Sequence, residues 1–371
     1  MEVWSGLAKA GSPRRTMEST YQHRPKATTP TGGGQCYTGD SLGEAFAWLC
    51  HSRREAQPQH DVWRLRERWD EAKGPLLESL QEGGYRLSPV ALANGPEGKR
   101  FECWEAEDAV VLKMLSLTLT PVLSERLSPR CYNLPDRGGS KGAVRAVRDA
   151  LASGRYPFVM KTDVKGYYAH ILHTRLLEQA RRHIGDPVVL DLISQYAERT
   201  TVHHGHYKRI EKGIPLGCSL SPLMGALYLS PLDERLEKLP GIMFARFQDD
   251  VVILAEKRWK LRRAIKVLNE TFAELSVEQH PDKTFIGRVE RGFDFLGYQF
   301  HCDCFDSSPL ASQPGSSEEM DPEQSNSTEK PNHKLKLNKI TLRPARRSIE
   351  RFAEKVTRLY ERKASNELVG D

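Results

Sequence analysis

The stretch Phe244-Ala-Arg-Phe-Gln-Asp-Asp-Val-Val-Ile-Leu-Ala255 sets two adjacent aspartates, Asp249 and Asp250, between two apolar runs. Both runs are rich in β-forming residues, so the pattern predicts a β-hairpin with an acidic tip. Like charges so close repel each other, and the arrangement is favourable only where a cation neutralises them or water solvates them. A solvated turn is the ordinary alternative for an isolated pair, because aspartate is a common turn residue.

A third aspartate, Asp163, stands at the end of another predicted strand, 158–164, before the chain turns into a helix. If this strand neighbours the hairpin, three carboxylates converge. Mg²⁺ prefers oxygen ligands and keeps several waters, so such carboxylates together with substrate phosphates form the usual phosphoryl-transfer site. The sequence therefore predicts that Asp163, Asp249 and Asp250 hold two Mg²⁺ ions. At such a site the metal ions stabilise the developing charge, and the protein forms no covalent intermediate.

The composition permits a nucleic-acid partner without requiring one. The chain has 371 residues, enough for two or three lobes, and 55 Lys and Arg against 49 Asp and Glu give a formal charge of +6. Basic charge gathers near the C-terminus, where residues 334–363 carry eleven Lys or Arg against three Glu.

The cysteines and the hydropathy pattern favour a cytoplasmic protein without a membrane span. Seven scattered cysteines and a start without an apolar secretory core indicate reduced thiols. The most hydrophobic region, 109–123, is interrupted by Lys113, Ser116 and several threonines, which is typical of an amphipathic helix.

Helices of unequal length alternate with short strands, which favours an α+β arrangement. Gly83 and Gly84 stop the second predicted helix, Pro121 marks the end region of the third, and Ser221 with Pro222 supplies an N-cap and first-turn proline for the fourth. The predicted helices are 41–54, 61–82, 106–123, 221–239, 257–275 and a basic helix after residue 345.

Five motifs stand in the order shown by reverse transcriptases, and from about Gly83 to Phe300 the chain resembles that family. It is most similar in form to bacterial group II intron-like enzymes. The matching segments are Met160–Tyr168 for the first catalytic motif, Gly213–Pro222 for the template-primer motif, Phe247–Asp250 for the aromatic-x-Asp-Asp turn, His280–Thr284 for the lysine motif and Phe293–Tyr298 for the primer grip.

The resemblance implies a right-hand polymerase with fingers, palm and a short helical thumb. It would be an RNA-directed DNA polymerase that extends a DNA or RNA primer on an RNA template with deoxynucleoside triphosphates. The expected parts are a disordered segment 1–39, N-terminal helices and fingers 40–157, a palm 158–300, a flexible polar insertion 301–333 and a basic partial thumb helix 334–371.

The resemblance also assigns roles at the metal site and beside the sugar. Asp163 and Asp249 would be the main ligands and Asp250 an accessory one. Tyr168, five residues after the first aspartate, would be the steric gate against the 2′-hydroxyl. The alternative for Tyr167 and Tyr168 is ordinary packing under a helix. One of the two is expected to be such a packing residue.

Four further residues receive substrate roles. Gly217 would let a backbone amide approach the base pair, and Lys283 would protonate the leaving pyrophosphate. Lys99 and Arg100, after the turn 95–98, would clamp phosphates. The alternative for Gly217 is a simple turn glycine. The alternative for Lys283, Lys99 and Arg100 is that they are solvated surface cations.

Two positions depart from the family pattern, and two His or Cys clusters resemble a metal site. Leu216 stands where many relatives have Gln, and Gln248 fills a position that is more often small or Met, which affects substrate choice rather than the metal site. His203-His-Gly-His206, expected in one strand, and the pair Cys302 and Cys304 lack zinc-finger spacing, so no metal is assigned to them.

No endonuclease or retron signature is found, which points to a free-standing lineage with a retroelement or antiviral-defence role. A dedicated non-coding RNA is an allowed partner. Two alternatives remain: a template-independent or RNA-synthesising palm polymerase, and a degenerate nucleic-acid-binding scaffold. Tyr168 argues against the first, and retention of all three aspartates argues against the second.

Overall fold

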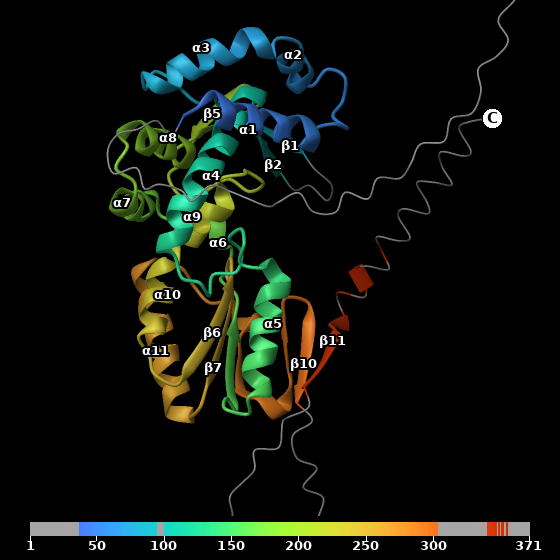
Figure 1. Ribbon diagram of the computed structural model, residues 1–371, viewed down its shortest axis with the longest axis vertical. Coiled ribbons are helices and arrows are strands. Elements are labelled where there is room, and N and C mark those ends of the chain that lie inside the picture. The colour runs from blue at the N-terminus through green and yellow to red at the C-terminus, as the bar shows by residue number, and fades with distance from the viewer. Residues whose placement is uncertain are drawn as a thin grey trace, which may run out of the picture. The chain divides into compact units, whose positions relative to one another are not determined.

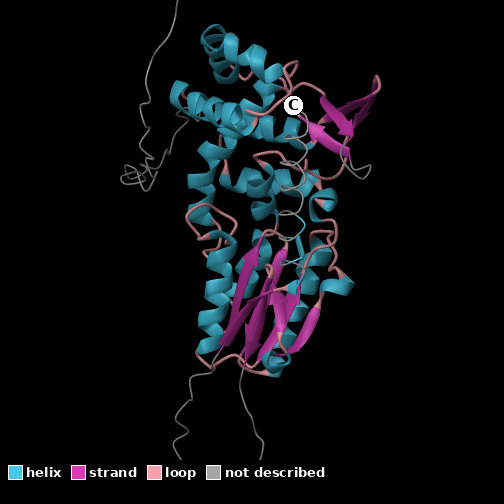
Figure 2. Ribbon diagram, turned by 90° about the vertical axis from the view of Figure 1, so that its right-hand side faces the viewer, coloured by secondary structure: helices cyan, strands magenta, loops and turns pink. Residues whose placement is uncertain are grey.

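The computed structural model describes residues 37–94, 100–302 and 340–346, with 348, 350, 351 and 354. Helices and sheets both contribute, which confirms the α+β class (Figures 1 and 2). A palm with a sheet at its centre lies in the lower part of both views, and a helix-rich part that carries a second sheet lies above it.

The palm sheet has four antiparallel strands in the order β6-β7-β3-β8. Its strands are β3 (Phe158–Thr162), β6 (Ile242–Phe247), β7 (Asp250–Ala255) and β8 (Phe285–Arg288). The predicted hairpin and the predicted first strand are therefore direct neighbours, with Thr162 opposite Val251 in the register.

Both faces of the palm sheet are covered, which explains why the second half of the hairpin is apolar without interruption. Val251, Ile253 and Ala255 join the core that includes α11 (Arg258–Glu274), whereas Val252 and Leu254 face α5 (Gly139–Ala152). A three-stranded sheet packs on the α5 side as well. It consists of β9 (Phe293–Phe295), β10 (Tyr298–Cys302) and β11 (Ile340–Pro344).

The upper part is built around α4 (Ala106–Arg126). This helix was expected to be amphipathic, but buried residues occur on nearly all its sides, so it is a central core helix. Pro121 lies inside the helix, as in the predicted range 106–123, and the helix ends three residues later than predicted, at Arg126. Against it and around it lie α1 (Gly39–Ser52), α2 (Asp61–Glu67), α3 (Trp69–Gln81), α7 (His173–His183), α8 (Pro187–Ala197) and α9 (Ser221–Tyr228).

A second four-stranded sheet has the order β2-β1-β4-β5. Its strands are β1 (Val90–Asn94), β2 (Arg100–Cys103), β4 (Thr200–His203) and β5 (His206–Arg209). The histidine run therefore forms a hairpin turn at His204 and Gly205, not one strand as expected. The positive φ of both residues, 49° and 78°, is what a tight turn requires.

Two predicted helices are each divided. The helix 61–82 breaks at Arg68, where α2 ends and α3 begins. The helix 221–239 divides at Leu229 into α9 and α10 (Ser230–Glu237), each with a proline in its first turn. Ser221 is not the N-cap: its hydroxyl donates to the carbonyl of Pro215.

Only parts of the predicted terminal segments and of the predicted insertion lie within the described residues. The segment 1–39 and the insertion 301–333 fall largely outside the described residues, although Tyr37 is buried and α1 already begins at Gly39. The range 334–371 was expected to be helical, but 340–344 form β11, which pairs with β10. Of the basic helix after residue 345, the described residues 346, 348, 350, 351 and 354 are helical.

Candidate active site

The tip of the palm hairpin holds two of the three predicted carboxylates. Phe247 pairs with Asp250, so Gln248 and Asp249 make the turn itself. Gln248 adopts a left-handed φ of 56°, a conformation that side-chain-bearing residues rarely take. Both aspartates are half-buried, because the ends of β6 and β7 lie against the upper part of the molecule.

Asp163 follows directly on β3 and lies beside this tip. Only 6% of Asp163 is exposed, and its carboxylate lies close enough to Asp249 to shift the pKa of that residue. Burial and the Asp163 carboxylate raise the pKa of Asp249 to about 7. Burial and the same neighbour raise the pKa of Asp250 to about 6, although Lys161 and Lys283 act in the opposite direction. The three aspartates therefore form one electrostatically coupled group.

Lys283 supplies the cation at this group. Its ammonium forms an ion pair with Oδ2 of Asp163, and this contact raises the pKa of Lys283. The lysine follows a short turn that is tied to β3: the backbone N–H of His280 donates to the Asp163 carbonyl at 2.7 Å, and the hydroxyls of Thr162 and Thr284 lie 2.8 Å apart. The lysine motif thus reaches the first catalytic motif through backbone and side chain.

The donor set fits a hard divalent cation. Carboxylate oxygens are what Mg²⁺ prefers, and in the metal-free protein burial and repulsion from Asp163 disfavour the charged forms of Asp249 and Asp250. Among the described residues, no group of three or more His, Cys, Asp or Glu side chains is placed so that it could hold a metal ion, and Lys283 engages one oxygen of Asp163. Further ligands would come from water and substrate phosphates, as is usual for Mg²⁺.

The two tyrosines of the first motif have different surroundings. Tyr167 is buried and its hydroxyl donates to the carbonyl of Gly225. Tyr168 is half-buried, its hydroxyl has no hydrogen-bond partner, and burial and the Asp249 charge raise its pKa. A Cβ on Gly225 would lie 2.9 Å from the ring of Tyr168, so this glycine makes room for it. Tyr167 is therefore a packing residue of the core, whereas Tyr168 lies near the Asp249 carboxylate.

The template-primer motif lies against the segment that carries Tyr168. Ile214 donates its N–H to the Tyr168 carbonyl at 2.8 Å. Gly217 has a φ of 82°, and a Cβ there would meet nothing within 4 Å. The glycine is exposed and faces open space, which leaves room for a close approach by a ligand. Leu216 beside it has 69% of its surface exposed.

The predicted primer-grip segment forms the β9–β10 hairpin, with its turn at Leu296 and Gly297. Lys161, on β3, reaches across to this hairpin and forms an ion pair with Asp294 at 2.5 Å. This contact joins the hairpin to the strand that carries Asp163.

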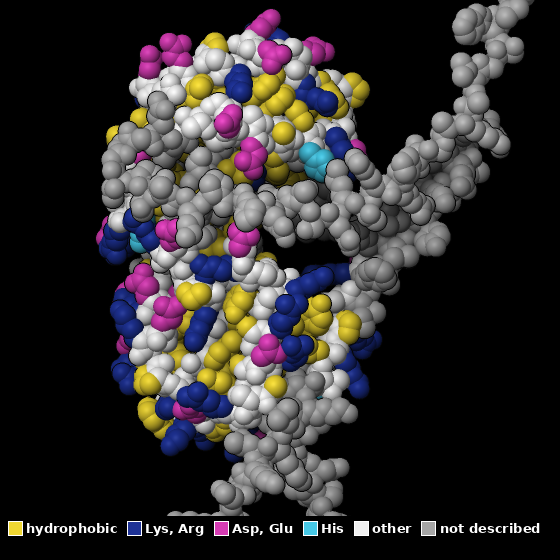
Figure 3. All heavy atoms as spheres, viewed as in Figure 1, with side chains coloured by type: hydrophobic (Ala, Val, Ile, Leu, Met, Phe, Trp, Pro, Cys, Tyr) yellow, Lys and Arg dark blue, Asp and Glu magenta, His cyan; other side chains and the backbone are white. Residues whose placement is uncertain are grey.

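Of the predicted phosphate clamp, Lys99 and the turn 95–98 lie outside the described residues. Arg100 begins β2, and its backbone pairs with Asn94 of β1, as a hairpin requires. The face drawn in Figure 3 is hollowed between the upper part and the palm, and Lys and Arg side chains gather along the palm side of this hollow.

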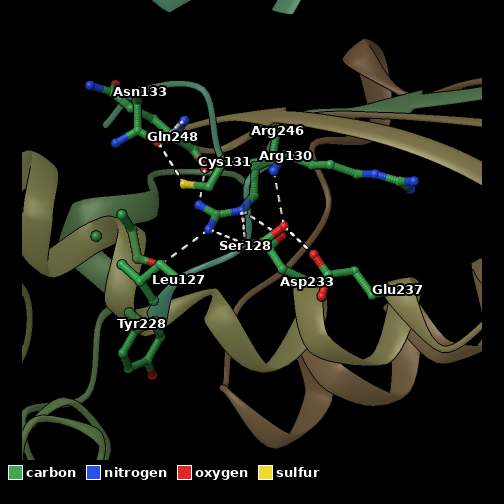
Figure 4. Close-up of polar contacts among 12 residues, drawn as sticks. Leu127, Ser128, Arg130, Cys131, Asn133, Tyr228, Asp233, Glu237, Arg246 and Gln248 are labelled. Atoms are coloured by element: carbon green, nitrogen blue, oxygen red, sulfur yellow. Dashed lines mark hydrogen bonds and ion pairs between the residues drawn. The ribbon is translucent and has the colours of Figure 1, made fainter. Parts of the chain in front are cut away.

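One group of site residues escaped the sequence analysis. Arg246 is fully buried and donates to both carboxylate oxygens of Asp233 and, at 3.0 Å, to the carbonyl of Gln248 (Figure 4). A signal was present: Arg246 interrupts an apolar strand at a buried position, and a buried charge needs a partner. The partner could not be identified, because Asp233 lies in another element.

The motif geometry agrees with the sequence comparison. The family model described as reverse transcriptase (RNA-dependent DNA polymerase) matches residues 102–300, which is more than half of the chain. The chain belongs to the reverse transcriptase family. At family level this reverse transcriptase is a nucleotidyltransferase, an RNA-directed DNA polymerase of the bacterial group II-like lineage.

Two relatives support the lineage. The reverse transcriptase is 21% identical over 265 residues to Protein YkfC of Escherichia coli (strain K12), covering 60% of this chain and 70% of YkfC. It is 21% identical over 164 residues to the group II intron-encoded protein LtrA of Lactococcus lactis subsp. cremoris. That match covers 43% of this chain and 27% of LtrA, so it spans about a quarter of LtrA's length.

Proposed function

We propose that this reverse transcriptase extends a DNA or RNA primer on an RNA template with deoxynucleoside triphosphates at the cluster of Asp163, Asp249 and Asp250. The observation that carries the proposal is the convergence of these carboxylates, from two neighbouring strands, beside Lys283. Folding alone gains nothing from such a cluster, because burial and mutual repulsion disfavour the charged forms.

In this proposal the aspartates provide the oxygen ligands. When bound, two Mg²⁺ ions would activate the primer hydroxyl and neutralise charge on the triphosphate. The Asp163 carboxylate raises the pKa of Asp249, and this electrostatic contact suits the two residues as the main ligands. Asp250 is the accessory ligand, because Lys161 and Lys283 partly offset its charge.

Lys283 would act on the leaving group. Its ammonium lies at the carboxylate cluster, and its raised pKa keeps the amine protonated at neutral pH. An ammonium in that place stabilises charge on the leaving pyrophosphate and donates a proton to it.

Tyr168 and Gly217 would shape the nucleotide pocket. The ring of Tyr168 is held by Gly225 beside Asp249, so it would form a wall against the 2′ position of the incoming sugar. Gly217 would let the backbone approach the base pair. The phosphate clamp by Lys99 and Arg100 is part of the same proposal.

The wider setting follows from the family resemblance. A dedicated non-coding RNA, a retroelement or antiviral-defence role and a cytoplasmic location are extensions of the proposal. Among the helices that the structure describes, none combines the length and apolar character needed to cross a membrane.

The test is primer extension by the purified protein in Mg²⁺, with deoxynucleotides or ribonucleotides, on an RNA template or without a template. The proposal expects templated addition of deoxynucleotides. Equal addition without template would favour template-independent synthesis, and a preference for ribonucleotides would favour an RNA-synthesising polymerase. Template-primer binding without any extension would favour a degenerate scaffold.

A further inference from the structure

The backbone of Gln248, the residue before Asp249, is held at both its N–H and its carbonyl. Gln248 carries the left-handed φ of 56° at the centre of the turn. Its N–H donates to Oδ1 of Asn133 at 3.1 Å, and its carbonyl accepts from Nη1 of Arg246 at 3.0 Å. A residue with a side chain does not hold this conformation by preference, so the surrounding contacts must impose it.

The loop that carries Asn133 is fastened to the strand before the turn. Arg246 donates its backbone N–H to the carbonyl of Arg130 at 2.9 Å, and its own carbonyl accepts from the N–H of Tyr132 at 2.8 Å. The side chain of Arg246 is fixed in turn by Asp233, which is fully buried. This loop is therefore an extra strand-like edge on β6, and Figure 4 shows its residue Asn133 beside Gln248.

Asn133 also reaches a third element. Its Nδ2 donates to the carbonyl of Pro222 at 3.2 Å, in the first turn of α9, and its Oδ1 accepts a second contact from the Cys131 thiol at 3.1 Å. The template-primer motif ends at Pro222. One side chain thus links the turn that carries Asp249 to the start of the helix that follows Gly217.

We propose that Asn133 is a positioning residue that fixes the Gln248–Asp249 turn and couples it to the template-primer motif. The inference rests on the proposed function, because the turn matters for the reaction through Asp249. Asparagine suits the place since it offers an acceptor to Gln248 and a donor to Pro222 without a charge beside three carboxylates. Aspartate would keep the acceptor alone, and alanine would keep neither.

The first test does not depend on activity. Amide hydrogen exchange is measured on peptides that span β6 and β7 in the full-length, metal-free protein. Asn133→Ala should speed exchange at the turn by up to about tenfold, which corresponds to one lost hydrogen bond. Asn133→Asp should stay within about threefold of wild type. Ser140→Ala, at an exposed position of α5, is the control and should change nothing.

The second test separates positioning from folding stability. Asn133→Ala should lower kcat about tenfold and raise the Mg²⁺ concentration for half-maximal rate, while the Kd for template-primer changes less than about twofold. Asn133→Asp should recover part of the rate. Gln248→Gly in the Asn133→Ala background should also recover part, because glycine adopts the left-handed turn without support.

The possible results distinguish a failure of the inference about Asn133 from a failure of the proposed function. A lowered Tm with unchanged exchange at the turn and unchanged Mg²⁺ dependence would make Asn133 a purely structural residue and overturn the inference. If Asn133→Ala does not fold, adding Gln248→Gly should restore folding, because glycine adopts the left-handed turn without support, and a double variant that still does not fold overturns the inference. A wild-type protein that extends no primer removes the proposed function, whereas the exchange measurement still decides whether Asn133 fixes the turn.

Discussion

Lys283 forms an ion pair with Asp163 although the two residues stand 120 positions apart in the sequence. The pair brings the lysine motif to the end of the strand that carries the first catalytic motif. It also places one cation at the group of three carboxylates, two of which, Asp249 and Asp250, have raised pKa values. The contact is half-exposed on the lysine side, so its contribution to stability is expected to be under about 1 kcal/mol.

Replacing Lys283 should therefore affect the reaction more than the fold. Lys283→Gln should lower kcat about a hundredfold, the usual scale for loss of a general acid, and Lys283→Arg should be intermediate because it keeps the charge. Single-turnover rates and thermal denaturation measure the two effects. A Lys283→Gln rate within about twofold of wild type would make Lys283 a surface cation.

The metal-free protein should lose stability as pH rises. The pKa of Asp249 is raised from 3.8 to about 7 on folding, so its stabilising contribution is present below the ordinary pKa and is lost as pH rises through about 7. Asp249→Asn removes this dependence. Denaturation with a chelator at about pH 5 and about pH 8 should show a smaller loss in the variant, by on the order of 2 kcal/mol. Equal losses in both proteins would contradict the electrostatic coupling.

Tyr168→Ala should admit ribonucleotides, because the wall beside the sugar is removed while the aspartates still align the phosphates. The measurement is the ratio of ribonucleotide to deoxynucleotide incorporation efficiency on one primer-template. Tyr167→Phe is the matched control: it loses the hydroxyl that donates to Gly225 and should lower stability without changing the ratio. An unchanged ratio in Tyr168→Ala would leave Tyr168 as a packing residue.

Gly217→Ala should weaken template-primer binding about tenfold. The φ of 82° makes alanine unfavourable by about 1 kcal/mol, but a Cβ meets no protein atom within 4 Å, so the fold should persist. Gly74→Ala is the control, since a Cβ there also meets nothing within 4 Å and its backbone is helical. Unchanged affinity in Gly217→Ala would make Gly217 a simple turn glycine.

Much of the palm could be predicted because its signals are local. Runs of β-forming residues predicted the strands, and the motif order indicated that Asp163 and the hairpin aspartates meet. The register of β3 with β7 confirms that these strands are neighbours. The separation of Tyr167 from Tyr168 could not be predicted, because it depends on Gly225, which lies in a distant helix.

The errors arose where tertiary contacts outweigh local preference. α4 continues past Pro121 and past its predicted end at residue 123, because Leu119 and Leu123 are buried in the core. β11 was assigned to a helix, but its partner β10 precedes it by a long insertion, which no local pattern reveals. Asn133 has no motif of its own, and its role follows only from the hydrogen bond to Gln248.

We propose that Asp249 is a ligand of the catalytic cations. The most direct measurement is the single-turnover rate of deoxynucleotide addition to a primer on an RNA template, by wild type and Asp249→Asn at equal folded concentration in Mg²⁺. The variant should be folded and should lose at least about a thousandfold in rate, because a fixed oxygen ligand is replaced by a neutral amide. A variant rate within about tenfold of wild type, with wild-type contamination excluded, would contradict the claim.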